Sequence, residues 1–153
     1  MDVRIETEGQ WPEAVERLLR GLPEWFGIEQ PILDYIEAAR TMPSTAAVVD
    51  GAVVGICLIR QHTPVASEVD LLAVHRDFHR LGIGRRIIDR VVADARQAGV
   101  KLLQVKTFGP SGQSVEYERT RAFYEAVGFL ALEERTDIWG RENPCLISVK
   151  PLS

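Results

Sequence analysis

The segment His79–Arg86, with the sequence HRLGIGRR, combines two glycines with three arginines. Residues 68–74 before it predict a strand, and residues 86–99 after it predict a helix. Glycine lets an anion approach the backbone closely, and the first turn of a helix has unpaired N–H groups and a positive dipole end. Arginine adds charge-assisted hydrogen bonds to phosphate oxygens. The segment therefore has the chemistry of a diphosphate-binding loop, although a tight turn with solvated arginines would use the same residues.

Two common nucleotide-binding patterns are absent from this segment. The dinucleotide fingerprint G-x-G-x-x-G fails because Ile87 stands where the third glycine belongs. The P-loop pattern fails because no Gly-Lys-Ser/Thr follows the glycines. We therefore expect a diphosphate ligand other than NAD or ATP.

A second predicted helix carries three hydroxyl groups. Tyr117, Thr120 and Tyr124 follow one another at i, i+3 and i+7, so they share one stripe of that helix. Gly128 is a natural end for it. The apolar residues of the same segment predict a separate core face, which consists of Ala122, Phe123, Ala126 and Val127.

Residues 71–88, LLAVHRDFHRLGIGRRII, resemble the signature of the GNAT superfamily of N-acetyltransferases, roughly (R/Q)-x-x-G-x-(G/A). His79 occupies the first motif position in place of Arg or Gln. The resemblance implies that acetyl-coenzyme A is the co-substrate and that the backbone of Ala73 and Val74 bonds its pantetheine arm and thioester oxygen. It also implies a pyrophosphate site at the loop, made by His79, Arg80, Leu81, Gly82, Ile83, Gly84 and Arg85.

Residues 119–129, RTRAFYEAVGF, resemble the later motif of the same superfamily, near N-x-x-A-x-x-F-Y-x-x-x-G-F. Tyr117 stands where asparagine commonly contacts coenzyme A, and Thr120 replaces the small alanine. Both are expected cofactor contacts. The resemblance assigns Tyr124 as the acid that protonates the departing thiolate, in a direct transfer from a ternary complex with no acyl-enzyme.

An acceptor amine also needs a base, because an alkyl ammonium is mostly protonated at neutral pH. Glu68 and Asp70 lie two apart on the strand that leads to the loop, so they share one face of it. We expect Glu68 to be the base and Asp70 to contact the acceptor, although both acids could instead be solvated. His62 and His75 remain possible bases.

The segment LPEWFGIE, residues 22–29, lies between the first two predicted helices, where related proteins build much of the acceptor pocket. Trp25 and Phe26 could form walls of that pocket, and Glu24 and Glu29 could attract a cationic amine. A hydrophobic plug between the helices is the competing interpretation. The expected acceptor is a small primary amine, and a homodimer is possible.

Residues 1–153 predict one domain, with 46% hydrophobic and 26% charged residues. The net charge of −4 argues against nucleic acid, and no apolar run is long enough for a membrane span. Cys57 and Cys145 are expected to be buried, reduced thiols of a cytoplasmic protein, and no ligand spacing for a metal occurs. The competing function is a catalytically silent sensor or partner-binding module that binds acetyl-coenzyme A.

The predicted elements follow the order β-α-α-β-β-β-α-β-α-β-β. The second helix is expected at residues 32–40, a hairpin at Asp50-Gly51, and two closing strands at the C-terminal end. The last strand could be exposed and pair with a partner, or be a sheet member within one chain. The predicted fold is α+β and GNAT-type, with a mostly antiparallel, mixed sheet of about six or seven strands and about four flanking helices in three α/β/α layers.

Overall fold

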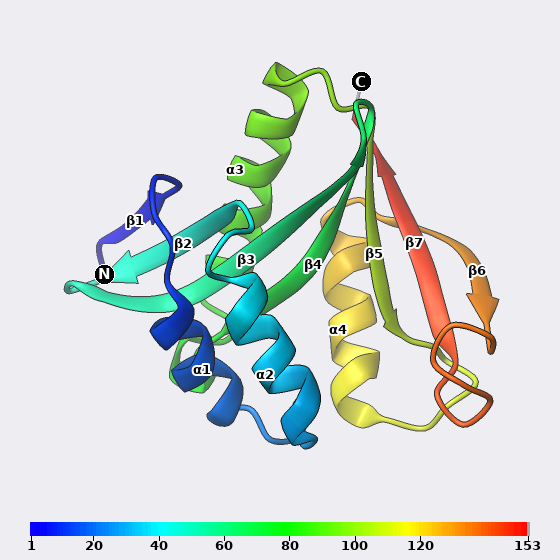
Figure 1. Cartoon of the computed structure of the whole chain (residues 1–153). Coiled ribbons are helices and arrows are strands. Elements are labelled where there is room, and N and C mark those ends of the chain that lie inside the picture. The colour runs from blue at the N-terminus through cyan, green and yellow to red at the C-terminus, as the bar shows by residue number, and fades with distance from the viewer. Residues whose placement is uncertain (153) are drawn as a thin grey trace. The chain divides into compact units, whose positions relative to one another are not determined.

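A computed structural model describes residues 1–152 as two compact units, each considered by itself (Figure 1). Unit 1 comprises residues 1–60 and 69–94, and unit 2 comprises residues 61–68 together with residues 95 onward. Strands β3 (Ala52–Thr63) and β4 (Ala66–Val74) each contribute residues to both units.

One mixed sheet contains all seven strands of the described residues, in the order β1-β2-β3-β4-β5-β7-β6. The observed pairings β1/β2, β2/β3, β5/β7 and β7/β6 are antiparallel. Seven strands with four helices confirm the predicted fold class. The remaining strands are β1 (Val3–Glu6), β2 (Ser44–Val49), β5 (Leu102–Phe108), β6 (Leu130–Arg135) and β7 (Cys145–Pro151). The helices are α1 (Pro12–Arg20), α2 (Glu29–Ala38), α3 (Ile83–Gln97) and α4 (Val115–Ala126), with a 3-10 turn η1 (Arg76–Phe78).

In unit 1 the sheet is covered on both faces. The amphipathic helices α1 and α2 bury Val15, Leu18 and Ile32 in a core that includes side chains of β2, β3 and β4. Helix α3 packs on the opposite face, where a Cβ at Gly55 of β3 would lie 2.9 Å from Ile87 Cδ1. Figure 1 shows α1 and α2 in front of these strands and α3 behind them. The sheet therefore fixes the direction of α3 and the position of its first turn.

Local signals in the sequence placed most elements correctly. Asp50 and Gly51 both have positive φ, 51° and 79°, which is the hairpin geometry that their types predict. Helix α4 follows Ser114, whose hydroxyl accepts a hydrogen bond from the Tyr117 N–H at 3.2 Å. It is followed by Gly128, with φ 100°. Helix α2 begins at Glu29, three residues before the predicted start.

Two expectations about unit 2 change. The predicted core face of α4 is confirmed at Val127, which is buried, and in part at Phe123, which is half-buried, but it was wrong at Ala122 and Ala126, which are exposed, and it omitted Tyr124, which is buried. Tyr124, the last member of the hydroxyl stripe, is the buried residue of α4, and Tyr117 and Thr120 are half-buried. Strand β7 is a sheet member with β5 and β6 on its two sides, and the edge strand is β6, in which all six residues are exposed.

Within residues 1–152 no helix combines the length and the apolar character that crossing a membrane requires. Both cysteines are free and buried, as predicted. Burial raises the pKa of the Cys57 thiol far above its ordinary value, so this group stays protonated and unreactive.

Candidate active site

We call residues 79–85 the glycine loop; they comprise the segment 79–82 between η1 and α3 and the first three residues of α3. Arg80 has φ 64° and Gly82 has φ 79°, so the chain turns through two left-handed residues before α3 begins at Ile83. No atom lies within 4 Å of the position of a Cβ at Gly82. The space beside Gly82 is therefore open, and the first N–H groups of α3 have no partner within the helix. An anion such as a diphosphate fits this arrangement.

His79 links the glycine loop to the end of β4. Its Nε2 lies 2.7 Å from the carbonyl oxygen of Val74, and its ring meets Trp25 edge to face, with centroids 5.9 Å apart. Val74 and Ala73 form the strand end that the sequence assigned to the pantetheine arm. The structure thus brings together, within unit 1, the strand end, the loop and one of the proposed acceptor residues.

Arg76 adds a second link, which sequence reasoning missed. Its Nη2 lies 2.5 and 2.8 Å from the two carboxylate oxygens of Glu24, and it donates to the Gly21 carbonyl at 3.4 Å. The guanidinium holds the pKa of Glu24 below its ordinary value. The α1–α2 connection is therefore held beside η1. No local signal could have indicated a pair 52 residues apart.

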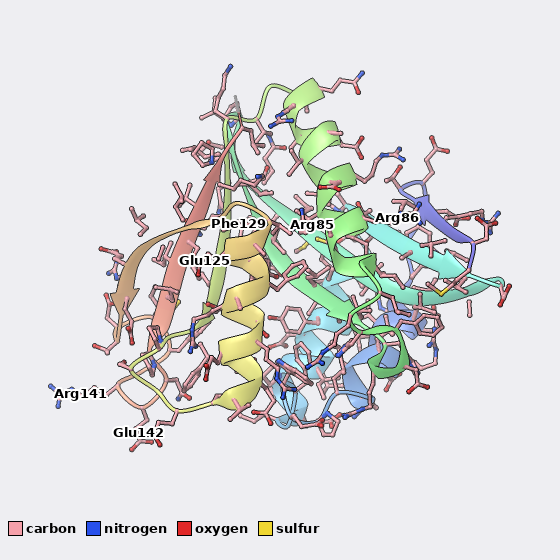
Figure 2. All side chains as sticks on the ribbon, turned by 180° about the vertical axis from the view of Figure 1, so that it is seen from behind. Arg85, Arg86, Glu125, Phe129, Arg141 and Glu142 are labelled. Carbon is pink, nitrogen blue, oxygen red and sulfur yellow. The ribbon has the colours of Figure 1, made fainter. Side chains whose placement is uncertain are left out.

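The three arginines of the joint have different surroundings. Arg80 and Arg85 are exposed. Arg86 donates through Nη2 to the Val3 carbonyl at 3.0 Å, which ties α3 to β1. Figure 2 shows Arg86 on the β1 side of α3 and labels Arg85 on the other side. Arg80 and Arg85 are therefore the two exposed arginines of the glycine loop.

Most of the proposed acceptor-binding residues of unit 1 already contact other side chains of the protein. Trp25 and Phe26 are half-buried against the core formed by α1 and α2, and the Phe26 ring meets Tyr35 edge to face. Glu29 accepts two hydrogen bonds from Arg20, at 2.9 and 2.7 Å, which lower its pKa. A separate ion pair joins Asp70 to Arg60 at 3.2 Å.

Glu68 lies in unit 2, in a polar cluster that we call the Glu68 cluster: His62, Glu68, Gln104 and Lys106. The Glu68 side chain is only 7% exposed. Its Oε1 lies 2.6 Å from His62 Nε2, 3.2 Å from Gln104 Nε2 and 3.2 Å from Lys106 Nζ. Lys106 also lies 3.3 Å from Oε2. Sequence reasoning found the carboxylate and missed the two partners on β5.

The hydroxyls of α4 also lie in unit 2. Burial raises the pKa of Tyr117, so its phenol remains a neutral hydrogen-bonding group at ordinary pH. Its ring lies against Phe108, with centroids 5.6 Å apart. Thr120 Oγ1 donates to the Glu116 carbonyl at 3.1 Å. Tyr124 is 7% exposed, and its ring meets Phe123 and Phe129 edge to face.

Thr107 of β5 carries an orphan hydroxyl: among the buried side-chain oxygen and nitrogen atoms of residues 1–152, it alone lacks a hydrogen-bond partner. Its hydroxyl has no hydrogen-bond partner, although the residue is 5% exposed. A buried hydroxyl without a partner costs about 1–3 kcal/mol. A ligand with amide groups would remove that cost, and pantetheine has such groups. Nothing in the sequence distinguishes this threonine from an ordinary strand residue.

A hollow of about 240 Å³ lies beside the Glu68 cluster in unit 2. Its walls are mostly apolar, with one imidazole, one hydroxyl and one amide; they are formed by His62, Ala66, Ser67, Leu102, Gln104 and Val149. In the described part of the chain, no group of three or more His, Cys, Asp and Glu side chains is arranged to hold a metal ion.

Comparison with known proteins gives one family and a large set of similar folds. The sequence model of the acetyltransferase (GNAT) domain matches residues 43–130, more than half of the chain. No curated protein matches the sequence.

Solved structures of low sequence identity share the fold. A GNAT-family protein from Desulfovibrio desulfuricans is 20% identical, with a TM-score of 0.85 over 99% of both chains. The ribosomal-protein-S18-alanine N-acetyltransferase of Escherichia coli is 14% identical, with a TM-score of 0.80 over 99% of this chain and 95% of that one. An aminoglycoside 6'-N-acetyltransferase complexed with coenzyme A is 17% identical, with a TM-score of 0.76 over 100% of this chain and 98% of that one.

Proposed function

Because the chain belongs to the GNAT family of acetyltransferases, we propose that it transfers the acetyl group of acetyl-coenzyme A to the nitrogen of a small primary amine. The glycine loop carries the proposal. Its open, left-handed backbone at Gly82 leads directly into the first turn of α3, inside the segment that matches the family. Similar structures with coenzyme A or acetyl-coenzyme A bound support the choice of co-substrate.

In unit 1 the proposed coenzyme site consists of the glycine loop and the end of β4. The loop residues 79–85 supply N–H groups and the cations of Arg80 and Arg85 for the pyrophosphate. The backbone of Ala73 and Val74 serves the pantetheine arm. For unit 2, considered separately, we propose Tyr117 and Thr120 as the cofactor contacts that the family motif implies, and the orphan hydroxyl of Thr107 as a further polar group for a ligand.

The chemistry requires one proton to leave the amine and one to reach the sulfur. Acetyl-coenzyme A supplies a thioester carbon that an amine can attack directly. An alkyl amine is mostly protonated at pH 7, and forming its neutral, nucleophilic form costs roughly 4–5 kcal/mol. A proton acceptor is therefore needed, and we propose that Glu68 is part of it. We propose that Tyr124 donates its phenolic proton to the leaving thiolate. Its burial among Phe123 and Phe129 supports this role because these contacts restrict the position of the ring that carries the hydroxyl.

The acceptor class follows from the charges of the proposed site. Glu29, Asp70 and Glu24 are each paired with an arginine, so few free carboxylates remain to attract a polycation. Similar structures act on the alanine of a ribosomal protein and on aminoglycosides, according to their names. We propose that the acceptor is a small monoamine or a peptide α-amine and not a polycation. We also propose that Trp25 and Phe26 contact it.

Thermal unfolding with added ligands tests the proposed co-substrate. Acetyl-coenzyme A at 100 times its dissociation constant should add about 2.7 kcal/mol, which raises the unfolding midpoint by several degrees. NAD and ADP should give smaller shifts. Thiol release on addition of amines then tests transfer. A midpoint shift without thiol release from any amine would favour the silent acetyl-coenzyme A sensor.

A matched glycine pair makes this test specific to the loop. Gly82 and Gly51 share φ 79°, and neither has an atom within 4 Å of its Cβ position. Gly82→Ala and Gly51→Ala should therefore carry the same backbone strain, about 1 kcal/mol. Only Gly82→Ala should reduce the shift that acetyl-coenzyme A produces. Equal shifts in the two variants would contradict the proposed loop site.

A further inference from the structure

His79 is the residue of the glycine loop that departs from the family motif, which has arginine or glutamine at this position. We propose that the His79 side chain does not bind the pyrophosphate and is instead a positioning residue that fixes Trp25, which contacts the acceptor amine. This inference rests on the proposed acetyl transfer and changes the role of one loop residue. His79, Trp25 and the end of β4 all belong to unit 1.

The N–H groups of His79 are directed toward the backbone of the protein itself. Nε2 lies 2.7 Å from the carbonyl oxygen of Val74. A carbonyl oxygen only accepts hydrogen bonds, so the hydrogen of this contact belongs to Nε2. The backbone N–H of His79 donates to the Arg76 carbonyl at 3.3 Å. In the neutral form, both N–H groups of His79 therefore already have acceptors, and neither is left for a phosphate oxygen.

The second ring nitrogen of His79 is unsuited to a diphosphate. In a neutral imidazole with its hydrogen on Nε2, Nδ1 carries a lone pair, and a lone pair that faces a phosphate oxygen forms no hydrogen bond. Arginine or glutamine at this position would still have an N–H to donate after one had bonded the Val74 carbonyl. Histidine supplies a further N–H only as the imidazolium. The departure from the motif therefore removes a phosphate contact that the motif residues would supply.

The His79 ring lies against Trp25. The ring centroids are 5.9 Å apart and the ring planes meet at 84°, an edge-to-face arrangement that aromatic pairs favour. Because the Val74 carbonyl holds the imidazole through Nε2, the imidazole limits the positions that are open to the indole. Trp25 is half-buried, so part of its ring is accessible to a ligand. The contact thus connects the strand end proposed for the thioester with a residue proposed for the acceptor.

A second contact holds the same stretch of chain in a different way. Arg76 pairs with Glu24, the residue before Trp25, and also donates to the Gly21 carbonyl. The two charged side chains are 50% and 35% exposed, and a solvated pair of this kind contributes little to stability. This pair acts on the backbone beside Trp25, whereas His79 acts on the indole ring.

The position of Trp25 can be measured without any acceptor. The chain has three tryptophans, so labelling of the whole protein with 5-fluorotryptophan gives three ¹⁹F signals, and the loss of one in Trp25→Phe assigns it. His79→Ala should shift and broaden the Trp25 signal, because the indole gains alternative positions, and should leave the other two signals in place. An unchanged Trp25 signal in His79→Ala would overturn the proposal.

Kinetics separate a positioning residue from a pyrophosphate ligand. With alanine amide, phenylethylamine and an alanine-initiated peptide as acceptors, His79→Ala should raise the acceptor KM about three- to tenfold. It should leave kcat and the affinity for acetyl-coenzyme A unchanged. The control is Asp77→Ala, which removes an 80% exposed carboxylate two residues away and should change none of these quantities. Weaker coenzyme binding in His79→Ala with an unchanged acceptor KM would overturn the proposal, because a pyrophosphate ligand behaves in that way.

His79→Gln restores a motif residue and should move the two affinities in opposite directions. Its amide has two N–H groups, one for the Val74 carbonyl and one for a phosphate oxygen, but it has no ring to hold Trp25. Acetyl-coenzyme A should bind about two- to tenfold more tightly, and the acceptor KM should rise as in His79→Ala. An acceptor KM equal to that of the wild-type protein would contradict the role of the His79 ring.

A double-variant cycle tests whether His79 acts through Trp25. In the Trp25→Ala background, His79→Ala should have no further effect on the acceptor KM, so the two effects should not add. The same effect of His79→Ala in both backgrounds would overturn the proposal.

The outcomes distinguish this inference from the proposed function. Wild-type turnover with an acceptor KM in His79→Ala within about twofold of the wild-type value would overturn the role of His79 while acetyl transfer stands. Wild-type protein that binds acetyl-coenzyme A but acetylates none of the three acceptors would contradict the proposed transfer, and the inference with it.

Discussion

At the residue scale, the hydroxyls of α4 show how position changes the role of one side-chain type. Tyr117 is partly buried against Phe108, and its pKa is raised by burial. Tyr124 is buried among aromatic rings. The phenol of Tyr117 is a neutral donor at ordinary pH, and only the family motif singles out Tyr124 as the acid. Its replacement is therefore the direct test of that assignment.

Tyr124→Phe should lower kcat by about 10- to 10⁴-fold, because a thiolate is a fair leaving group even without an acid. The ring packing is kept, so the free energy of unfolding should change by about 1 kcal/mol or less. Steady-state kinetics and chemical denaturation measure the two quantities. Unchanged turnover in Tyr124→Phe with every active amine would remove this residue from the mechanism.

Replacement of Arg80 should affect the free energy of unfolding and the affinity for acetyl-coenzyme A in different ways. It has φ 64°, a conformation that disfavours side chains with a Cβ. Arg80→Gly relieves that strain, so the unfolding free energy of the unliganded protein should be unchanged or higher by up to about 1 kcal/mol. Loss of the guanidinium should weaken acetyl-coenzyme A binding roughly tenfold. Calorimetry measures the affinity, and Arg80→Lys, which keeps both charge and strain, should retain most of it.

At the element scale, the direction of α3 depends on its close approach to β3. Gly55 makes this possible, because a Cβ there would lie 2.9 Å from Ile87 Cδ1 and 3.3 Å from Ile83 Cγ2. Ile83 and Gly84 also begin the helix whose first turn forms part of the glycine loop. The packing of α3 on Gly55 therefore also sets the direction of the first turn of α3, where the proposed anion site lies.

Gly55→Ala should lower the free energy of unfolding by about 1–3 kcal/mol through overpacking. Ile87→Val removes the nearest methyl group, so the double variant should lose less than the sum of the two single variants. Denaturant titration of the four proteins gives this coupling. Strict additivity would show that the helix does not rest on Gly55.

At the scale of the whole molecule, the two thiols report on the integrity of the fold. Both residues are fully buried, at 0% exposure, in different units of the chain. The transfer proposed above involves no acyl-enzyme and therefore no cysteine nucleophile. Buried thiols should then be silent in the native protein and appear only on unfolding.

Ellman's reagent should modify neither thiol of the native protein and both thiols in denaturant. The rate in native buffer should follow the opening of the structure and should slow when acetyl-coenzyme A is bound, because the ligand stabilises the folded state. Fast modification of one thiol in the native protein would contradict the observed burial.

Stability should also fall in alkaline solution. Burial raises the folded-state pKa of Cys57 and Tyr117 above their ordinary values of about 8.5 and 10. Above those values the unfolded chain loses the protons first, so the free energy of unfolding decreases as the pH rises. Cys57→Ala should show a smaller decrease between pH 8.5 and 10 in denaturation experiments. The same decrease in both proteins would mean that this thiol does not contribute.

The sequence by itself determined the features that depend on neighbouring residues. The hairpin at Asp50-Gly51, the glycine loop and the helix after it follow from backbone preferences, which spacing and residue type reveal. Tertiary structure alone decided which distant side chains meet. Glu24 with Arg76, Glu68 with Lys106 and the orphan Thr107 depend on strand register and helix placement, which no local pattern records. For that reason Glu68 could be found in the sequence, whereas its partners Gln104 and Lys106 came from the fold.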